Sequence, residues 1–292
     1  MKNSQPALGW SHPEWLVEKW RKNFGDEKTL ALLAWNNTPP KTFARVNTLK
    51  ADAVKLFERW RDEGVEYDSA ARDWTGEHMA FEFKLHPPLN SLGSFRDGWF
   101  YVQDPSTLLA PVLLGAQPGE TILDLCAAPG GKATFIAQQM NNEGKIMAQD
   151  VDQVRLRLVK DNCSRLGVTN VETILPSAFE LQPATFDRIL IDAPCSNTGV
   201  MRRRVDLRWR IQSVEIERLR TAQLGLLKQA AAKLKPGGVL VYSTCSLEPE
   251  ENLEVVKAFL TAHTNFKLET ERQLLPFTDG VDGAYVAKLV KS

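Results

Sequence analysis

From residue 116 onward, short apolar segments alternate with helical segments, and this alternation limits the fold more than any other feature of the sequence. Helical spacing occurs at 131–140, 152–166 and 213–234. Such an alternation is typical of a parallel sheet with helices on both faces, so the predicted fold class is α/β. Ligands of these sheets bind at the carboxyl ends of the strands. The predicted strands are TILDL, KIMAQ, VETI, FDRILI and GGVLVYS.

The sequence before this region has a different pattern. Residues 14–35 carry apolar residues at helical spacing interrupted by Gly25, and NNTPP ends the pattern, which predicts a helical N-terminal extension over residues 1–40. Strand-like and helix-like runs then predict a small α+β unit over residues 41–115. The α/β domain takes residues 116–292. The runs of the small unit are FARVNTL, ADAVKLFERWRDEG, HMAFEFKL and WFYVQD.

The turn after TILDL is rich in small residues and leads into a helix. Gly130 and Gly131 would let the backbone approach a ligand closely, and the free amides at the helix start favour an anionic group. The turn is neither the dinucleotide GxGxxG nor a Walker loop, so a nucleoside is a better candidate than a phosphate. The alternative is a tight turn that binds nothing.

Asp150 ends the second predicted strand, about 20 residues after these glycines, where an acidic side chain can bind both hydroxyls of a ribose. The alternative is that Asp150 caps the helix that begins near Asp152, since either aspartate could satisfy free amides there. Together, the turn and the acid favour an adenosine-containing cofactor.

Two cysteines, Cys195 and Cys245, each follow an apolar strand of the predicted sheet, so both could face one crevice. Either could instead be a small buried hydrophobe, which is the simplest interpretation of Cys163 on its amphipathic helix. Cys126 is most simply a small residue in the turn. No CxxC pair occurs, and the four histidines are scattered, so we expect no metal site.

Lysine plus arginine equals aspartate plus glutamate at 36 each, so a nucleic-acid surface would have to be a local basic patch. The best candidate is MRRRVDLRWRIQ, residues 201–212, with five arginines and Trp209. Arginines neutralise phosphates, and an aromatic ring can hold an unstacked base. The alternative is a solvated arginine face. The N-terminus lacks an apolar signal core and no run is long enough to span a membrane, so we expect a cytoplasmic protein with reduced thiols.

The motifs DLCAAPGGK, RILIDAPCSNTG and LKPGGVLVYSTCSLEPEEN, with RVNTLK and GWFYVQDPS before them, resemble the RsmB and Sun-type RNA cytosine-5 methyltransferases. The resemblance runs from about residue 12 to the terminal DGAYVAKLVKS. It implies a Rossmann-like class I methyltransferase fold, a small RNA-binding subdomain of RRM type, and S-adenosylmethionine as cofactor. The cofactor contacts it implies are Cys126, Ala127, Ala128, Pro129, Gly130, Gly131, Lys132, Asp150, Ser177 and Asp192.

One position departs from the family pattern. Where the family has an aspartate in a Gly-Asp pair near the adenine, this chain has Ser177, which offers a hydrogen bond but no charge. The separate N-terminal helical RNA-binding domain of bacterial members also has no counterpart here except the extension before residue 40.

The chemistry that the resemblance implies needs one thiolate, which adds to carbon 6 of cytosine and activates carbon 5. The residues alone do not show which of the two cysteines is the nucleophile. In DNA cytosine methyltransferases the cysteine of a Pro-Cys motif is the nucleophile, and here that motif contains Cys195. The RNA family implies Cys245 as the nucleophile, Cys195 as the release residue, Asp192 as the acid that orients the ring, and Lys132 near the base. The expected substrate is RNA, with 16S-type ribosomal RNA ahead of transfer RNA. A non-catalytic RNA-binding or ribosome assembly factor is the alternative from another class.

Overall fold

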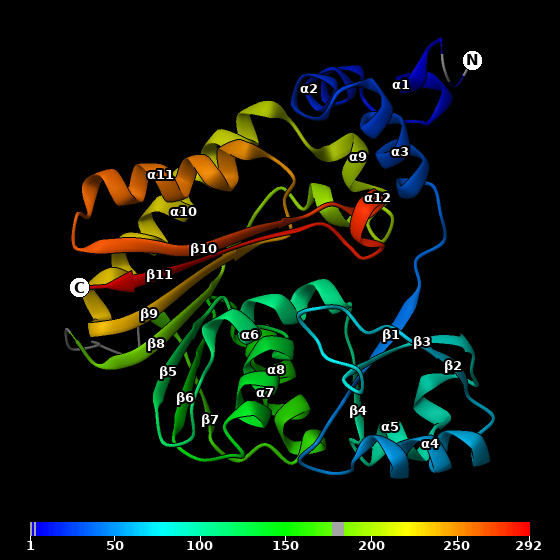
Figure 1. Cartoon of the computed structure of the whole chain (residues 1–292), viewed down its shortest axis with the longest axis vertical. Coiled ribbons are helices and arrows are strands. Elements are labelled where there is room, and N and C mark those ends of the chain that lie inside the picture. The colour runs from blue at the N-terminus through cyan, green and yellow to red at the C-terminus, as the bar shows by residue number, and fades with distance from the viewer. Residues whose placement is uncertain (1, 3, 177–183) are drawn as a thin grey trace.

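The computed structural model describes residues 2, 4–176 and 184–292, and its centre is a mixed seven-stranded sheet (Figure 1). The strand order is β10-β11-β9-β8-β5-β6-β7. From β9 to β7 every neighbouring pair is parallel, as the sequence predicts. The strands are β5 (Thr121–Leu125), β6 (Lys145–Gln149), β7 (Val171–Ile174), β8 (Phe186–Asp192), β9 (Leu234–Thr244), β10 (Phe266–Leu274) and β11 (Ala284–Lys291).

The last two strands were not predicted, and they make the sheet mixed rather than all parallel. Strand β11 pairs antiparallel with both β9 and β10. Strand β10 forms the edge, and most of its side chains are exposed. Because an edge strand needs no continuous apolar run, its sequence does not carry the pattern of a buried strand.

Helices cover both faces of the sheet, which confirms the predicted α/β class (Figure 1). One face packs against α6, α7 and α8 through a core that includes Phe135, Ile136 and Leu156. The other face packs against α10 and α11 through Leu227 and Phe259. These helices are α6 (Leu109–Leu114), α7 (Gly131–Gln139), α8 (Gln153–Leu166), α10 (Ser213–Lys233) and α11 (Leu253–Ala262).

A second, four-stranded antiparallel sheet precedes this domain, with the order β2-β3-β1-β4. One helix lies between β1 and β2 and a shorter one between β3 and β4, which is the βαββαβ order of ferredoxin-like units. Trp60 is fully buried at its centre. The elements are β1 (Thr42–Val46), α4 (Ala53–Asp62), β2 (Glu66–Ser69), β3 (Ala80–Leu85), η1 (Leu89–Ser91), α5 (Gly93–Arg96) and β4 (Phe100–Val102).

Arg45 joins this small sheet to the larger domain. Its buried guanidinium donates to the carbonyl oxygen of Gly131 at 2.8 Å, to Gln103 Oε1 at 2.7 Å and to Thr134 Oγ1 at 3.2 Å. Gly131 belongs to the predicted cofactor turn. The small sheet therefore supports that turn directly, through charge-assisted hydrogen bonds.

The N-terminal helices pack onto the far end of the large domain (Figure 1). Gly25, with φ of 81°, separates α2 from α3, in the left-handed region that glycine adopts without strain. Leu16 and Trp20 pack with Met201 and Leu247, which follow the two cysteine motifs. The remaining elements are α1 (Pro6–Gly9), α2 (Glu14–Phe24), α3 (Asp26–Asn36), η2 (Pro105–Leu108), η4 (Thr198–Val200), α9 (Leu207–Arg210), η5 (Pro249–Glu251) and α12 (Pro276–Asp279).

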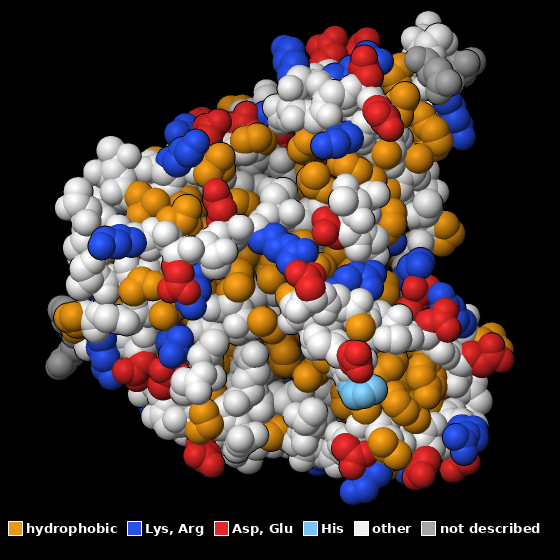
Figure 2. All heavy atoms as spheres, in the orientation of Figure 1, with side chains coloured by type: hydrophobic (Ala, Val, Ile, Leu, Met, Phe, Trp, Pro, Cys, Tyr) orange, Lys and Arg blue, Asp and Glu red, His pale blue; other side chains and the backbone are white. Residues whose placement is uncertain are grey.

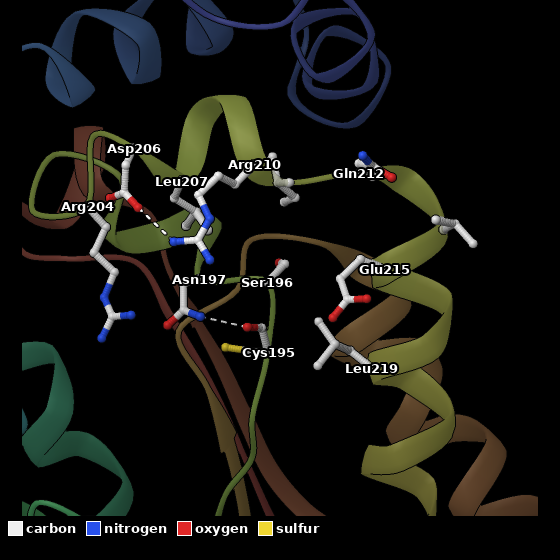
Figure 3. A pocket seen from close by; sticks show the side chains of 12 residues that line it. Cys195, Ser196, Asn197, Arg204, Asp206, Leu207, Arg210, Gln212, Glu215 and Leu219 are labelled. Carbon is white, nitrogen blue, oxygen red and sulfur yellow. Dashed lines mark hydrogen bonds and ion pairs between the residues drawn. The ribbon is translucent and has the colours of Figure 1, made fainter.

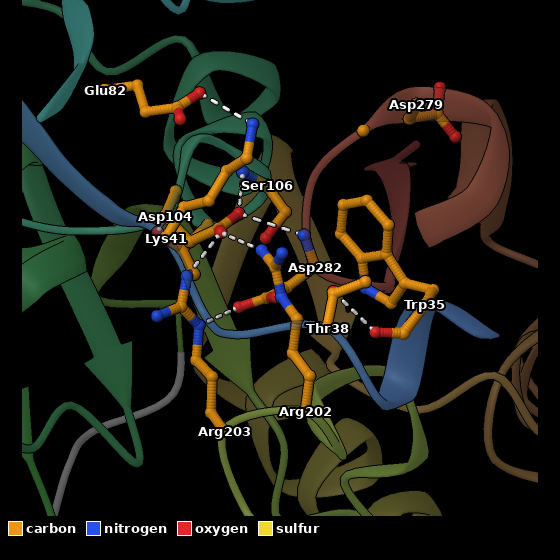
Figure 4. A network of polar contacts seen from close by, with 12 residues as sticks. Trp35, Thr38, Lys41, Glu82, Asp104, Ser106, Arg202, Arg203, Asp279 and Asp282 are labelled. Carbon is orange, nitrogen blue, oxygen red and sulfur yellow. Dashed lines mark hydrogen bonds and ion pairs between the residues drawn. The ribbon is translucent and has the colours of Figure 1, made fainter. Parts of the chain in front are cut away.

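The arginine segment 201–212 is only partly exposed. Arg202 and Arg208 are buried, whereas Arg203, Arg204 and Arg210 are exposed, so the basic surface is smaller than the sequence suggests. Arg202 is 3% exposed and donates to Asp282 at 2.8 Å, while its guanidinium lies over the Trp35 ring (Figure 4). Arg203 donates to Asp104 at 2.9 Å, and buried Arg208 donates to the carbonyl of Asn36. Buried carboxylates need such partners, so these arginines join loops rather than bind phosphate.

Candidate active site

The two cysteines lie side by side, because their strands are neighbours. Strands β8 and β9 pair in parallel with Asp192 opposite Ser243, so the loops that follow leave the sheet together. The sulfur atoms of Cys195 and Cys245 are 3.3 Å apart. Cys195 is 8% exposed and Cys245 is only partly buried, so Cys245 is the more accessible thiol.

Asn197 links the two cysteine loops, and the sequence analysis did not identify it. Its side-chain oxygen accepts a hydrogen bond from the Cys245 thiol at 3.0 Å, and its amide nitrogen donates to the carbonyl of Cys195 at 2.7 Å. Its backbone is left-handed, with φ of 59°. Asparagine is among the few residues that adopt this conformation, which was the available signal for a tight turn after Cys195.

The environments of the four cysteines differ. A hydrogen bond to Cys245, burial and the negative charge of Glu251 raise the pKa of Cys195 well above that of an ordinary thiol. Burial raises the pKa of Cys163 to about 11, in keeping with its predicted packing role. Burial and the charge of Asp192 raise the pKa of Cys126 to about 12, so this thiol in the turn is unsuited to act as a nucleophile.

Asp192 is the last residue of β8 and lies beside the predicted cofactor turn. One carboxylate oxygen is 2.6 Å from Lys132 Nζ, and the other accepts a hydrogen bond from Ser243 Oγ at 3.2 Å. Burial is the largest single influence and acts to lower the pKa of Lys132, but the charge of Asp192, its hydrogen bond to Lys132 and the charge of Asp124 act together to raise the pKa. Lys132 is therefore a cation that fixes Asp192, and it is not suited to accept a proton itself.

Asp150 lies at the end of β6 and is 4% exposed. One carboxylate oxygen accepts from the amide of Ala128 at 3.2 Å, and the other accepts from the amide of Asp152 at 3.1 Å. Asp152, not Asp150, caps α8, because its side chain accepts from Val154 and Arg155. Each Asp150 oxygen keeps acceptor capacity for a further hydrogen bond, such as one from a ribose hydroxyl.

Gly130 and Gly131 allow the turn to pack closely against neighbouring residues. Gly130 has φ of 101°, and a Cβ there would lie 3.2 Å from Val159 of α8. A Cβ on Gly131 would lie 3.1 Å from the Tyr101 ring. A side chain at either position would meet protein atoms, so close packing explains both glycines without a ligand. Ala127 and Pro129 complete the turn, whereas Ser177 lies outside the described residues.

Asp124 is a site residue that the sequence analysis missed. It is fully buried near the end of β5, and neither carboxylate oxygen accepts a hydrogen bond from the described residues. Burial and the charge of Asp192 raise its pKa to about 8. Buried polar atoms almost always have partners, so an unpartnered carboxyl beside this turn indicates a place for a polar ligand or water. The signal was a charged residue in an otherwise apolar strand.

A cavity of about 570 Å³ opens beside Cys195, between the loop Cys195–Asn197, α9 and the start of α10 (Figure 3). Its volume is within the range of small-ligand sites. Polar side chains surround it, including Arg204, Arg210 and Glu215, and Leu219 contributes an apolar wall. Of the two neighbouring cysteines, Cys195 lines this cavity.

Among the described residues, no group of three or more histidines, cysteines, aspartates and glutamates is arranged to hold a metal ion. No helix in the described part of the chain is both long and apolar enough to cross a bilayer.

Two family descriptions match the chain. The description "16S rRNA methyltransferase RsmB/F" matches residues 111–290, and a ferredoxin-like domain of RsmF/B-like methyltransferases matches residues 12–73. The chain belongs to the RsmB/F family. The resemblance inferred from the sequence motifs is thus confirmed, as is the Rossmann-like methyltransferase fold with a small α+β unit before it.

Individual relatives agree with this membership in the RsmB/F family. A probable ribosomal RNA small subunit methyltransferase B of Bacillus subtilis is 34% identical over 302 residues, covering 96% of this chain and 66% of that protein. The chain thus spans 66% of the length of such curated relatives.

Solved structures are similar as well. The crystal structure of PH0851 has a TM-score of 0.91 and 31% identity, covering 100% of this chain and 68% of that one. A methyltransferase homolog from Pyrococcus horikoshii has a TM-score of 0.84 and 32% identity, covering 98% and 97%.

Members of the RsmB/F family are S-adenosylmethionine-dependent methyltransferases, which confirms the predicted cofactor, and the residues around the turn suit it. Asp150 can accept a further hydrogen bond from a ribose hydroxyl. Neither carboxylate oxygen of Asp124 accepts a hydrogen bond from the described residues. Together with Asp192 they surround the turn with carboxyl groups. These carboxyl groups offer hydrogen-bond acceptors for the hydroxyls and the ammonium group of such a cofactor.

Substitution of Asp150 by asparagine is expected to weaken S-adenosylmethionine binding by tenfold or more. The variant replaces a charged acceptor, whose hydrogen bonds are worth about 1.5 to 3 kcal/mol, by a neutral one. Isothermal titration calorimetry measures the change. Asp152→Asn alters the neighbouring helix cap and should bind like the wild type, and equal affinity in all three proteins would remove Asp150 from the cofactor site.

Asp124 should make the free protein less stable as the pH rises. In the folded state its pKa is about 8, whereas an unfolded aspartate has a pKa of about 3.9. Between these values the folded protein binds a proton that the unfolded chain has lost, so this group's contribution to the free energy of unfolding falls as the pH rises. Urea denaturation at pH 5 and pH 8, without cofactor, should show a smaller fall for Asp124→Asn. The same fall in both proteins would mean that Asp124 does not titrate in this range.

Proposed function

We propose that this chain transfers a methyl group from S-adenosylmethionine to carbon 5 of a cytosine in RNA, with Cys245 as covalent nucleophile and Cys195 as the release residue. The observation that carries the proposal is the pair of thiols 3.3 Å apart at the ends of two parallel strands, with Asp192 on one of those strands held by Lys132. One ring could reach both sulfur atoms in turn.

The first half of the reaction uses Cys245 and Asp192. The Cys245 thiolate adds to carbon 6 of the ring, and the electrons of the carbon 5–carbon 6 double bond move to carbon 5. When bound, S-adenosylmethionine supplies the electrophilic methyl group that carbon 5 then takes. The Asp192 carboxyl is proposed to contact the exocyclic amine and ring nitrogen, while Lys132 and Ser243 fix its position.

The second half uses Cys195. Its thiolate takes the proton of carbon 5, the double bond re-forms, the sulfur–carbon 6 bond breaks, and the electron pair returns to Cys245. The raised pKa of Cys195 supports this order, because its largest cause is the hydrogen bond to Cys245. Once Cys245 is bonded to the ring, that hydrogen bond no longer holds the proton on Cys195. Cys195 can then lose its thiol proton to solvent and act as a base.

The cavity beside Cys195 is the proposed entry for RNA. A cytosine must leave its stack to reach the two sulfur atoms, and an unstacked base needs an aromatic or cationic platform. Trp209 is 63% exposed, and Arg204 and Arg210 are exposed at the cavity. Lysine and arginine side chains also lie across the middle of the face in Figure 2. This smaller surface replaces the patch expected from the arginine segment.

Small-subunit ribosomal RNA is the proposed substrate, because the curated relatives carry that substrate in their names. The cytoplasm is accordingly the proposed compartment. Transfer RNA remains the second candidate within the class. A non-catalytic assembly factor is disfavoured, since a protein that only binds RNA has no need of two adjacent thiols beside a positioned carboxylate.

Single cysteine substitutions should separate the two roles. Cys245→Ala is expected to abolish methyl transfer and to form no covalent complex, because no sulfur adds to carbon 6. Cys195→Ala should still add and methylate, but release fails and the protein remains joined to its RNA. The measurement is a denaturing gel of protein incubated with radiolabelled small-subunit ribosomal RNA transcript and S-adenosylmethionine, with Cys163→Ala as the matched control.

A trapped band in Cys245→Ala that depends on Cys195 would reverse the two roles. Full methylation by both variants would mean that neither cysteine takes part and would contradict the proposed mechanism.

A further inference from the structure

Glu251 is a fully buried carboxylate beneath the two cysteine loops. It ends the short helix η5 (Pro249–Glu251), which follows the Cys245 motif in the chain. Its charge contributes to the raised pKa of Cys195, and its side chain is hydrogen-bonded to serine and glutamine donors. A buried carboxylate is unfavourable unless hydrogen bonds compensate it, so its donors identify what it holds.

The donors come from both cysteine loops. The amide and the hydroxyl of Ser196 donate to the two oxygens of Glu251, the amide at 2.9 Å. The hydroxyl of Ser246 donates at 2.5 Å. Ser196 directly follows Cys195 and Ser246 directly follows Cys245, so one carboxylate binds the residue next to each cysteine. Gln223 of α10 completes the set at 3.1 Å.

The two loops are in close contact around this carboxylate. The two serine hydroxyls are 3.0 Å apart, and the amide of Gly199 donates to the carbonyl of Cys245 at 2.9 Å. A Cβ on Gly199 would lie only 2.7 Å from that carbonyl. The loops therefore have little room to separate as long as Glu251 holds both serines.

We propose that Glu251 is a positioning residue that keeps Cys195 and Cys245 at a separation where both can act on one ring. This inference rests on the proposed function for its purpose, but the geometry that it asserts is independent of any activity. Without the carboxylate, each loop would keep its own turn but lose the shared acceptor. The two sulfur atoms would then lie together for a smaller fraction of the time.

Substitution of Glu251 by glutamine separates the effect of its hydrogen bonds from the effect of its charge. Its side-chain oxygen can accept from the Ser196 amide and from Gln223, as one glutamate oxygen does now. Its amide nitrogen can donate to the two serine hydroxyls, which rotate to accept. Glu251→Gln thus preserves four hydrogen bonds without a charge, whereas Glu251→Ala removes all of them.

The separation of the two thiols can be measured without RNA. Diamide oxidises two neighbouring thiols to a disulfide and takes up the two electrons and two protons itself. We expect wild type and Glu251→Gln to form the Cys195–Cys245 disulfide at similar rates, and Glu251→Ala to form it at least tenfold more slowly. Peptide mapping by mass spectrometry, which distinguishes this pair from Cys126 and Cys163, gives the rate.

Smaller changes guard against a variant that does not fold. Ser196→Ala and Ser246→Ala each remove one hydroxyl and keep the carboxylate, and each should slow the disulfide severalfold. Glu250→Ala, which alters the neighbouring glutamate that pairs with Lys19, should not. Rates equal to wild type in the two serine variants, or in a folded Glu251→Ala, would overturn the proposal.

Activity gives the second measurement. With RNA, Glu251→Ala should lower kcat at least tenfold with little change in KM. Glu251→Gln should restore kcat. KM should change little because Glu251 is proposed to act on the two cysteine loops and not on RNA or cofactor. If the disulfide rates follow the prediction but the wild type methylates no RNA, the positioning role holds and the proposed function fails. If the wild type methylates RNA but Glu251→Ala keeps its kcat, the positioning role fails alone.

Discussion

The parallel pairing of β8 with β9 is the interaction on which the site depends. It sets Asp192 opposite Ser243, so the strand that carries the acid and the strand that leads to Cys245 end at the same level. The loops after these strands then bring Cys195 to 3.3 Å from Cys245. A shift of this register by one residue would turn the side chains of one strand to the opposite face and separate the two thiols from the carboxylate.

Residues that are distant in sequence contact the chain just after each cysteine motif and fix the two loops. Trp20 of α2 donates to buried Glu248 at 3.0 Å, just after the Cys245 motif. Arg202, just after the Cys195 motif, binds Asp282 at 2.8 Å in the turn before β11. The N-terminal helices and the C-terminal hairpin thus both support the site. Because buried ion pairs are weak sources of stability but sensitive to geometry, we regard these contacts as fixing the loops rather than stabilising the fold.

Features of the fold that depend on the local sequence pattern could be predicted. Periodicity gave the five parallel strands and their helices, and the position of Asp150 after its strand placed it beside the turn at Ala128. Contacts between distant residues carry no local signal. The partner of Arg202 lies 80 residues away, so the segment could be interpreted as solvated or RNA-binding but not as buried. Glu251 was missed for the same reason, whereas Asp124 did carry a local signal as a charged residue in an apolar strand. The predicted boundaries at residues 40 and 115 and the role of Ser177 stay predictions.

Identification of the residue that bonds to RNA tests the central claim most directly. RNA transcribed with 5-fluorocytidine cannot lose a proton from carbon 5, so an enzyme of this type stays attached after methyl transfer. Digestion of the wild-type complex and mass spectrometry of the cross-linked peptide then give the attached residue. We predict Cys245, with the methyl group on the ring. A cross-link through Cys195, or no cross-link with a folded protein and bound cofactor, would contradict the account.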